Sequence, residues 1–128
     1  MSEQGWAFEY AVLRVVPRME RGEQVNVGVL LYCQQADFLD VAVHLDEARV
    51  GAICHDLDLD DVRSALTSIA TVCAGGAAAG AVGSGSRRER FGWLTAPRST
   101  VVQPGPVHAG VTSDPAATLH RLLTRLVL

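Results

Sequence analysis

The sequence predicts an α+β fold in which an antiparallel β-meander of three to four strands packs against two to four helices. Three observations predict this class: apolar, strand-like segments stand at the start of the chain, short polar turns join them, and amphipathic helical patterns follow. Strands joined by short turns pair antiparallel, and the apolar face of such a sheet needs helices to cover it. With 128 residues, the chain has the length of a single domain with one core.

The first three strands are expected at residues 8–16, 25–33 and 38–45, because Val, Leu and aromatic residues are frequent there. Pro17 ends the first strand, and a polar turn that contains Gly22 leads to the second. The third strand alternates apolar and polar residues most regularly. In the second strand, strict alternation places five apolar side chains on one face: Val25, Val27, Val29, Leu31 and Cys33.

Helices are expected over residues 46–54, 58–74 and 88–95, and from Pro115 to the end of the chain. Asp58 is a typical N-cap for the long helix, and proline is favoured at the first position of a helix, as at Pro115. The apolar residues of the long helix recur at spacings of three and four, which predicts one buried stripe: Leu59, Val62, Leu66, Ile69 and Cys73.

Two segments between these elements are less regular. Residues 75–86 contain almost only Ala, Gly and Ser, and we expect a flexible connection within the single domain of residues 1–128. Residues 99–103 predict a fourth strand, and the Pro-Gly-Pro sequence at 104–106 ends it.

The net charge of −3 is unevenly distributed. Acidic residues dominate residues 37–61, whereas residues 87–98 contain four arginines and one glutamate. A general nucleic-acid binder is usually basic over its whole domain, so we do not expect that function. One localised site for an anionic group, such as a phosphate, a nucleotide or an acidic protein partner, fits this distribution.

We expect a cytoplasmic protein without a metal site or a cofactor. No apolar run reaches the length of a membrane-spanning helix, and no basic segment followed by an apolar stretch starts the chain. The three cysteines are far apart and form no C-x-x-C pair, so buried, unreactive thiols are expected. A metal site formed by three residues has no support from their spacing: His44, Cys54 and His55.

The segment 87–108 contains most of the residues that suit an anion site. Arg88 and Arg98 have forked donors for phosphate or carboxylate oxygens, and the hydroxyl of Ser99 can add a further donor. Trp93 can stack on a base, although an aromatic side chain belongs more often to the core. His108 is the one titratable residue of the segment suited to proton transfer, but no known catalytic motif surrounds it.

Two further polar residues stand inside predicted strands. Arg14 either faces solvent or projects from the sheet toward Asn26 or His44. Asn26 is the only asparagine and is unfavourable in a strand; it either satisfies backbone groups near the turn at Gly22 and Glu23 or contacts a ligand.

Two blocks of the sequence resemble a known family. Residues 10–17 read YAVLRVVP, and RGE at 21–23 and VNVGVLL at 25–31 follow them. The second block reads RFGWLTAPRST at 90–100 and continues with Gln103 and with PVH at 106–108. This chain resembles the bacterial domain-of-unknown-function 3037 family over almost its whole length. The resemblance implies a small single-domain protein without an assigned activity, often encoded beside a kinase-fold protein, which suggests such a protein as a partner.

The resemblance also selects polar residues from both blocks. If they act together, they must meet in space, so we expect the strand between residues 98 and 108 to lie beside the meander. Together with Arg88, the predicted binding residues are Arg14, Glu23, Asn26, Arg98, Ser99, Gln103 and His108. At Gly105 the chain departs from the family pattern, in which a hydroxyl residue is expected.

Three functional hypotheses remain open from the sequence. The first is a binding module for an anionic group or a protein partner, and it predicts an exposed patch around Phe91 and Trp93. The second is a small enzyme for a phosphorylated or nucleotide substrate, and it requires His108 within hydrogen-bonding reach of Ser99 or Glu23. The third is a hydrogen-bond network that only holds the fold together.

Overall fold

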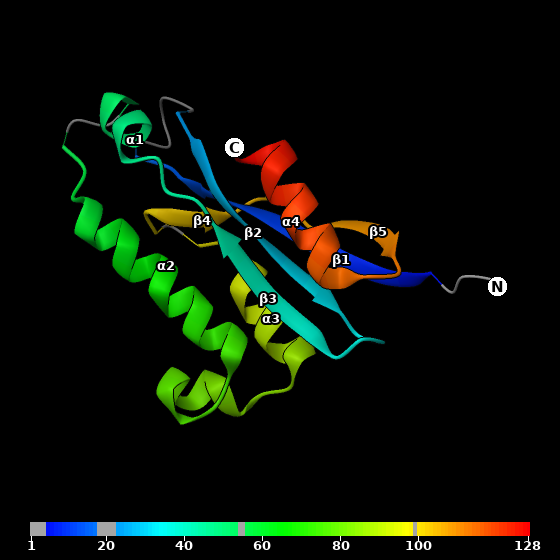
Figure 1. Cartoon of the computed structure of the whole chain (residues 1–128). Helices are drawn as coiled ribbons and strands as arrows, with labels where there is room; N and C mark the ends of the chain where they lie inside the picture. Colours follow the sequence, from blue (N-terminus) through cyan, green and yellow to red (C-terminus); the bar gives the residue numbers. More distant parts are fainter. Residues whose placement is uncertain (1–4, 18–22, 54–55, 99) are drawn as a thin grey trace.

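The computed structural model describes residues 5–17, 23–53, 56–98 and 100–128. Its centre is a five-stranded sheet in which every pairing is antiparallel (Figure 1). The order is β3-β2-β1-β4, and β5 also pairs with β1. The strands are β1 (Trp6–Val15), β2 (Val25–Cys33), β3 (Phe38–Val43), β4 (Val102–Pro104) and β5 (His108–Thr112).

Helices cover both faces of the sheet, which confirms the predicted α+β class. The α2, α3 and η2 helices lie on one face, and α4 lies on the other, over β2 and β3 (Figure 1). The bounds are α1 (Glu47–Ile53), α2 (Leu59–Ala74), the 3₁₀ helix η2 (Ala77–Ser84), α3 (Arg87–Thr95) and α4 (Pro115–Leu126).

The helices begin where the sequence predicts caps. The side chain of Asp58 accepts a hydrogen bond from the backbone N–H of Asp60 at the start of α2, and Asp114 caps α4 in the same way. At α3, Ser86 and Glu89 form a reciprocal capping box. The bonds from Ser86 lower the pKa of the Glu89 carboxyl below its usual value, because they stabilise its charged form.

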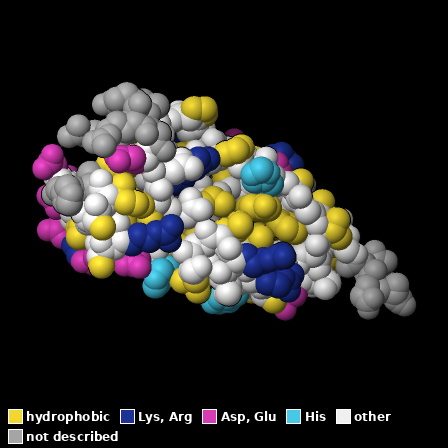
Figure 2. Space-filling view, turned by 90° about the horizontal axis from the view of Figure 1, so that it is seen from above, with side chains coloured by type: hydrophobic (Ala, Val, Ile, Leu, Met, Phe, Trp, Pro, Cys, Tyr) yellow, Lys and Arg dark blue, Asp and Glu magenta, His cyan; other side chains and the backbone are white. Residues whose placement is uncertain are grey.

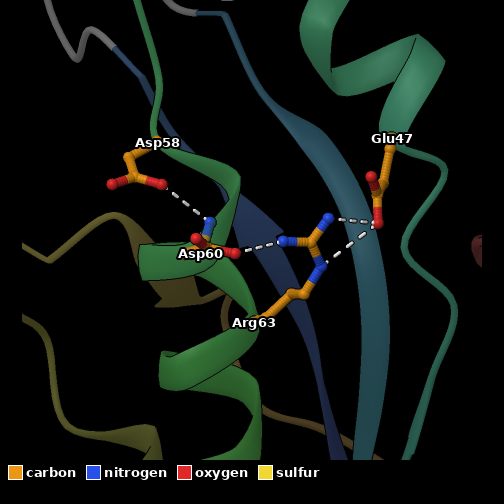
Figure 3. A network of polar contacts seen from close by, with 4 residues as sticks. All are labelled: Glu47, Asp58, Asp60 and Arg63. Atoms are coloured by element: carbon orange, nitrogen blue, oxygen red, sulfur yellow. Dashed lines mark hydrogen bonds and ion pairs between the residues drawn. The ribbon is translucent and has the colours of Figure 1, made fainter.

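An exposed ion-pair network joins α1 to α2. The guanidinium of Arg63 lies 2.7 Å from the carboxylate of Glu47 and 2.5 Å from that of Asp60 (Figure 3). Because all three groups are accessible to water, the network contributes little to stability. It connects the first turn of α1 with the first turns of α2.

A β-bulge at Val27 changes which residues of β2 share a face. Leu13 pairs with Gly28, whereas Arg14 pairs with Asn26, so Val27 is the extra residue. Val25 and Val27 therefore pack under α1 and α2, whereas β2 residues beyond the bulge, such as Val29, pack under α4. The prediction that all five apolar residues of this strand share one face is wrong, because both faces of β2 are apolar and alternation alone cannot reveal the bulge.

Two predictions for the second half of the chain also need correction. The segment 75–86 is not a simple flexible connection: Gly75 and Gly76, with φ of 75° and 88°, turn the chain into η2. Ala79 and Val82 of η2 then pack against the core cluster of α2 and α3. Strand β4 occupies only Val102–Pro104, and β5, which follows the Pro-Gly-Pro sequence, was not predicted.

A helix that crosses a membrane must be both long and apolar. No single helix among the described residues is long and apolar enough to cross a membrane. The bent pair of α2 and η2, which meet at 61°, passes the same length and composition criteria only when taken together.

The buried guanidinium of Arg90 joins three segments on the α2 side of the sheet. Its Nε donates to the carbonyl of Val72 (2.9 Å), Nη1 to Gly85 (2.6 Å) and Nη2 to Cys73 (3.3 Å). The side chain thereby satisfies carbonyls at the C-terminal end of α2, where a positive charge is also favourable. Gly75 makes room for it, since a Cβ atom there would lie 3.0 Å from Cζ of Arg90.

We predict that Arg90→Met lowers the free energy of unfolding by about 3 kcal/mol, because it leaves buried carbonyls without donors. Urea denaturation followed by circular dichroism measures the change. Arg87→Met, at an exposed position of the same helix, is the matched control and should stay within about 0.5 kcal/mol of the wild type. Equal losses in both variants would contradict the role of Arg90.

We predict that native Cys73 reacts with iodoacetamide about a thousand-fold more slowly at pH 8.5 than in the urea-unfolded chain. Burial raises the pKa of the Cys73 thiol to about 12, and the negative charge of Asp40 adds to the shift. Only the thiolate reacts, and its fraction at pH 8.5 is therefore very small. Peptide mass spectrometry after timed labelling measures both rates, and similar rates in the two states would contradict the prediction.

Candidate functional site

Three predicted site residues lie side by side across neighbouring strands. Arg14 of β1 pairs with Asn26 of β2 on one side and with Gln103 of β4 on the other. Paired residues of antiparallel strands project to the same face of a sheet. Their neighbours Leu13 and Val102 are buried under the opposite face, so this polar row belongs to the α4 side. The prediction that the late strand lies beside the meander is confirmed for these residues.

The guanidinium of Arg14 lies over the corner between β4 and β5. Its Nη1 donates a hydrogen bond of 2.8 Å to the side-chain oxygen of Gln24. A Cβ atom at Gly105 would lie 2.3 Å from Nη2 of Arg14, so only glycine leaves room for the side chain in this position. The backbone N–H of Gly105 donates to the carbonyl of Val12, which fixes the corner against β1.

Asn26 has a structural contact on the same face. Its Nδ2 donates a hydrogen bond of 3.0 Å to the carbonyl of Leu126 at the end of α4. This bond satisfies a carbonyl that has no partner within the helix, and it anchors α4 to β2. The alternative in which Asn26 serves the turn near Gly22 and Glu23 falls in part on Gly22, which lies outside the described residues.

His108 lies further along β1, opposite Tyr10. The two rings are 5.2 Å apart, and the imidazole is exposed to solvent. The upper side of the molecule, where β4, β5 and α4 lie, is seen in Figure 2: hydrophobic side chains gather in its middle, and arginines and histidines lie around them. His108 therefore belongs to the same face as Arg14 but not to its immediate surroundings.

Arg98 does not join this polar row. It follows α3, which packs on the α2 side of the sheet, and it lines the same surface depression as Gln103 and Gly105 at the β4–β5 corner. Its guanidinium stacks on the ring of Trp93 at 4.5 Å from the centroid and donates to the carbonyls of Trp93 and Ala96. These contacts hold the Arg98 side chain against its own helix, and no contact between Arg98 and Arg14 is among those of the described residues, so their meeting on one face stays a prediction.

A shallow groove of about 480 Å³ separates the end of α3 from the β4–β5 corner. We call it the corner groove. Arg98, Gln103 and Gly105 contribute to it, and three prolines make much of its wall apolar. Its complete lining is Thr95, Pro97, Arg98, Gln103, Pro104, Gly105, Pro106 and Val107.

Arg88 lies at the opposite end of the sheet. Its Nη2 donates to the side chain of Gln34 (3.2 Å), and its guanidinium lies 5.8 Å from the ring centroid of Tyr32. From Asn26 to Tyr32 the strand extends about 20 Å, so Arg88 cannot share a small ligand with Arg14. The hypothesis that both arginines form one site is therefore wrong; depressions of about 370 and 430 Å³ border Arg88 separately.

The enzyme hypothesis requires Ser99 or Glu23 close to His108. Ser99 lies outside the described residues. Glu23 precedes Val25, which pairs with Val15, whereas His108 pairs with Tyr10; these positions are about 17 Å apart along β1. The geometry that the enzyme hypothesis requires between His108 and Glu23 is therefore absent.

The two aromatic residues of α3 differ in burial. Phe91 is buried, in a stacked contact with Tyr32, whereas Trp93 is 46% exposed. The exposed patch that the binding hypothesis predicts is thus observed at Trp93 alone. Sequence reasoning did not identify Gln24 as a partner of Arg14 or Gly105 as the residue that accommodates it; the glycine between two prolines was the only available signal.

Comparison with known proteins agrees with the resemblance noted from the sequence. A family model described as "Protein of unknown function (DUF3037)" matches residues 10–127. The chain belongs to the DUF3037 family. Neither the curated proteins nor the solved structures contain a significant match. Both sequence blocks of this DUF3037 member meet at the β1–β4 pairing, where Arg14 lies beside Gln103.

We predict that Asn26→Ala lowers the free energy of unfolding by about 1 kcal/mol, because α4 loses a side-chain hydrogen bond at its C-terminal end. Thermal or urea denaturation measures the loss. Gln24→Ala, which removes the exposed partner of Arg14, is the control and should change stability by less than about 0.5 kcal/mol. A stable Asn26→Ala variant would show that the contact with Leu126 does not anchor the helix.

Proposed function

We propose that this protein is a small binding module that recognises an anionic group of a protein partner at the corner groove. The partner's carboxylate or phosphate approaches Arg98 in the groove, and Arg14 contributes positive charge from the other side of Gly105. The apolar wall that the prolines form accepts the neighbouring part of the partner. Recognition of this kind needs no chemical step from the protein.

The observation that carries the proposal is the charge at the corner. The guanidinium of Arg14 lies against Gly105, and Arg98 lines the corner groove to which Gly105 also belongs; among the described residues neither arginine forms an ion pair with a carboxylate. Each of them keeps N–H donors beyond its described hydrogen bonds, because a guanidinium has five. Forked donors of this type suit carboxylate and phosphate oxygens.

The charge distribution of the whole chain supports a localised site. The net charge is −3, so the protein as a whole does not attract anions over its surface. An anionic partner is attracted only where arginines gather without acidic neighbours. This arrangement favours specific docking over general binding to nucleic acid.

The partner we propose first is a kinase-fold protein of the kind that the family resemblance places beside such genes. Free phosphate and nucleotides are the small ligands that the same arginines suit. A partner that carries an acidic residue or a phosphorylated residue contains the same recognised chemistry. The experiment below therefore compares the protein partner with the small anions.

We predict that the kinase-fold protein binds the chain and that Arg98→Gln and Arg14→Gln each weaken the dissociation constant about tenfold. Loss of one charge-assisted hydrogen bond corresponds to about that factor. Isothermal titration calorimetry measures the affinities, and thermal shifts with inorganic phosphate and ATP test the small anions. Arg49→Gln, at an exposed position of α1, is the matched control and should bind as the wild type does.

Since Arg98 also bonds to carbonyls of α3, each variant is compared with its own unliganded melting temperature and circular dichroism spectrum. Equal weakening by Arg49→Gln would show a general charge effect and contradict the proposed site. Absence of binding by the kinase-fold protein, phosphate and ATP would contradict the proposed function. Binding of phosphate or ATP alone would restrict the function to a small anionic ligand.

A further inference from the structure

The two outer strands of the sheet differ in how their free edges are protected. β3 has the exposed carboxylate of Asp40 in the middle of the strand, and α2 and α4 pack against it. Charged residues and covering helices are the usual means by which proteins prevent edge-to-edge pairing. The β3 edge is therefore protected.

The β5 edge has no charged residue, and its described contact with a helix is at Thr112, at the end of the strand. In the part of the chain that the structure describes, β5 pairs only with β1, so its other side presents unpaired backbone groups. Residues 101–113 contain no Asp, Glu, Lys or Arg, and His108 is their only ionisable residue. Val111 is 73% exposed and Val107 is 43% exposed. An uncharged, apolar edge of this kind favours pairing with another strand.

The two faces of β5 explain why valines are exposed there. Thr112 faces α4, where its hydroxyl lies 2.6 Å from that of Thr118, and Gly110 lies against the ring of Phe8. Because side chains alternate along a strand, Ala109 and Val111 project to the opposite face. No described helix packs on that face of β5.

We infer that β5 is a dimerisation edge and that its occupant is β5 of a second copy of this chain. Antiparallel pairing about a two-fold axis joins the two five-stranded sheets into one continuous sheet of ten strands. The pairing matches the same uncharged segment with itself, so no like charges meet along the strands. The two His108 side chains lie toward opposite ends of the pair when Gly110 is near the axis.

Closure of the assembly favours this occupant over a head-to-tail contact. Pairing of β5 with the β3 edge of another copy repeats without end and produces fibres, and it would bring the carboxylate of Asp40 into the contact. When β5 of one copy pairs with β5 of the second copy, the unprotected β5 edges of both copies are covered. The dimer then exposes its two protected β3 edges and the outer edges of the three-residue β4 strands.

The test is the molar mass of the full chain in solution. We expect sedimentation velocity at 100 µM to give twice the chain mass of 13.6 kDa. Val111→Lys should raise the dimer dissociation constant about a hundred-fold, about tenfold for each copy of the substitution, because a lysine on the edge disfavours pairing. Val43→Lys, at the 40% exposed end of the β3 edge, is the matched control and should remain dimeric.

A second measurement requires no variant. Dilution of the wild-type chain from 100 to 1 µM should accelerate hydrogen exchange of those amides in residues 108–112 that point away from β1, while amides of β2 stay protected. A monomer at 100 µM overturns the inference. A dimer that Val43→Lys dissociates and Val111→Lys does not would place the interface on β3 and also overturn it.

Discussion

The pairing of β1 with three strands is the constraint on which the rest of the structure depends. Ala11, Leu13 and Val15 of this strand are at most 1% exposed. On one side β2 pairs along almost the whole strand, whereas on the other side β4 and β5 lie end to end. Because β4 and β5 both pair with the same edge of β1, the chain between these two strands must turn away from that edge. The corner groove exists because β1 is longer than either partner.

Glycine and proline at this corner act through different physical properties. The two prolines have no backbone N–H, so they interrupt the ladder of hydrogen bonds along β1. Gly105 restores one contact through its N–H and leaves space for the guanidinium of Arg14. The bulge at Val27 then brings Asn26 opposite Arg14. The position of Arg14 is therefore set from both sides by backbone features rather than by ion pairs.

The sequence was sufficient for elements that depend on local patterns. The α+β class, the meander, and the cap at Asp58 follow from periodicity and from the hydrogen bonding of N-cap side chains, whereas the capping box of Ser86 and Glu89 was not predicted. The bulge at Val27 was not predictable, since both faces of β2 are apolar. Likewise, nothing local separates Arg88 from Arg14; only the strand register shows that they lie at opposite ends of β2. Strand β5 was missed because its alternation is obscured by alanine and glycine.

The structural contacts of Arg98 are compatible with the binding role that we propose for it, because of the geometry of the guanidinium group. Two of its nitrogens donate to the carbonyls of Trp93 and Ala96 at the end of α3, which fixes the plane of the group over the indole. The donors that remain are then held in a defined direction, and less entropy is lost when an anion binds than with a free side chain. A lysine has a single ammonium group on a flexible stem. It therefore cannot donate to the helix carbonyls and at the same time hold two further donors in a fixed direction. The contacts that hold Arg98 at the end of α3 are thus also contacts that would orient it for the anionic partner that we propose.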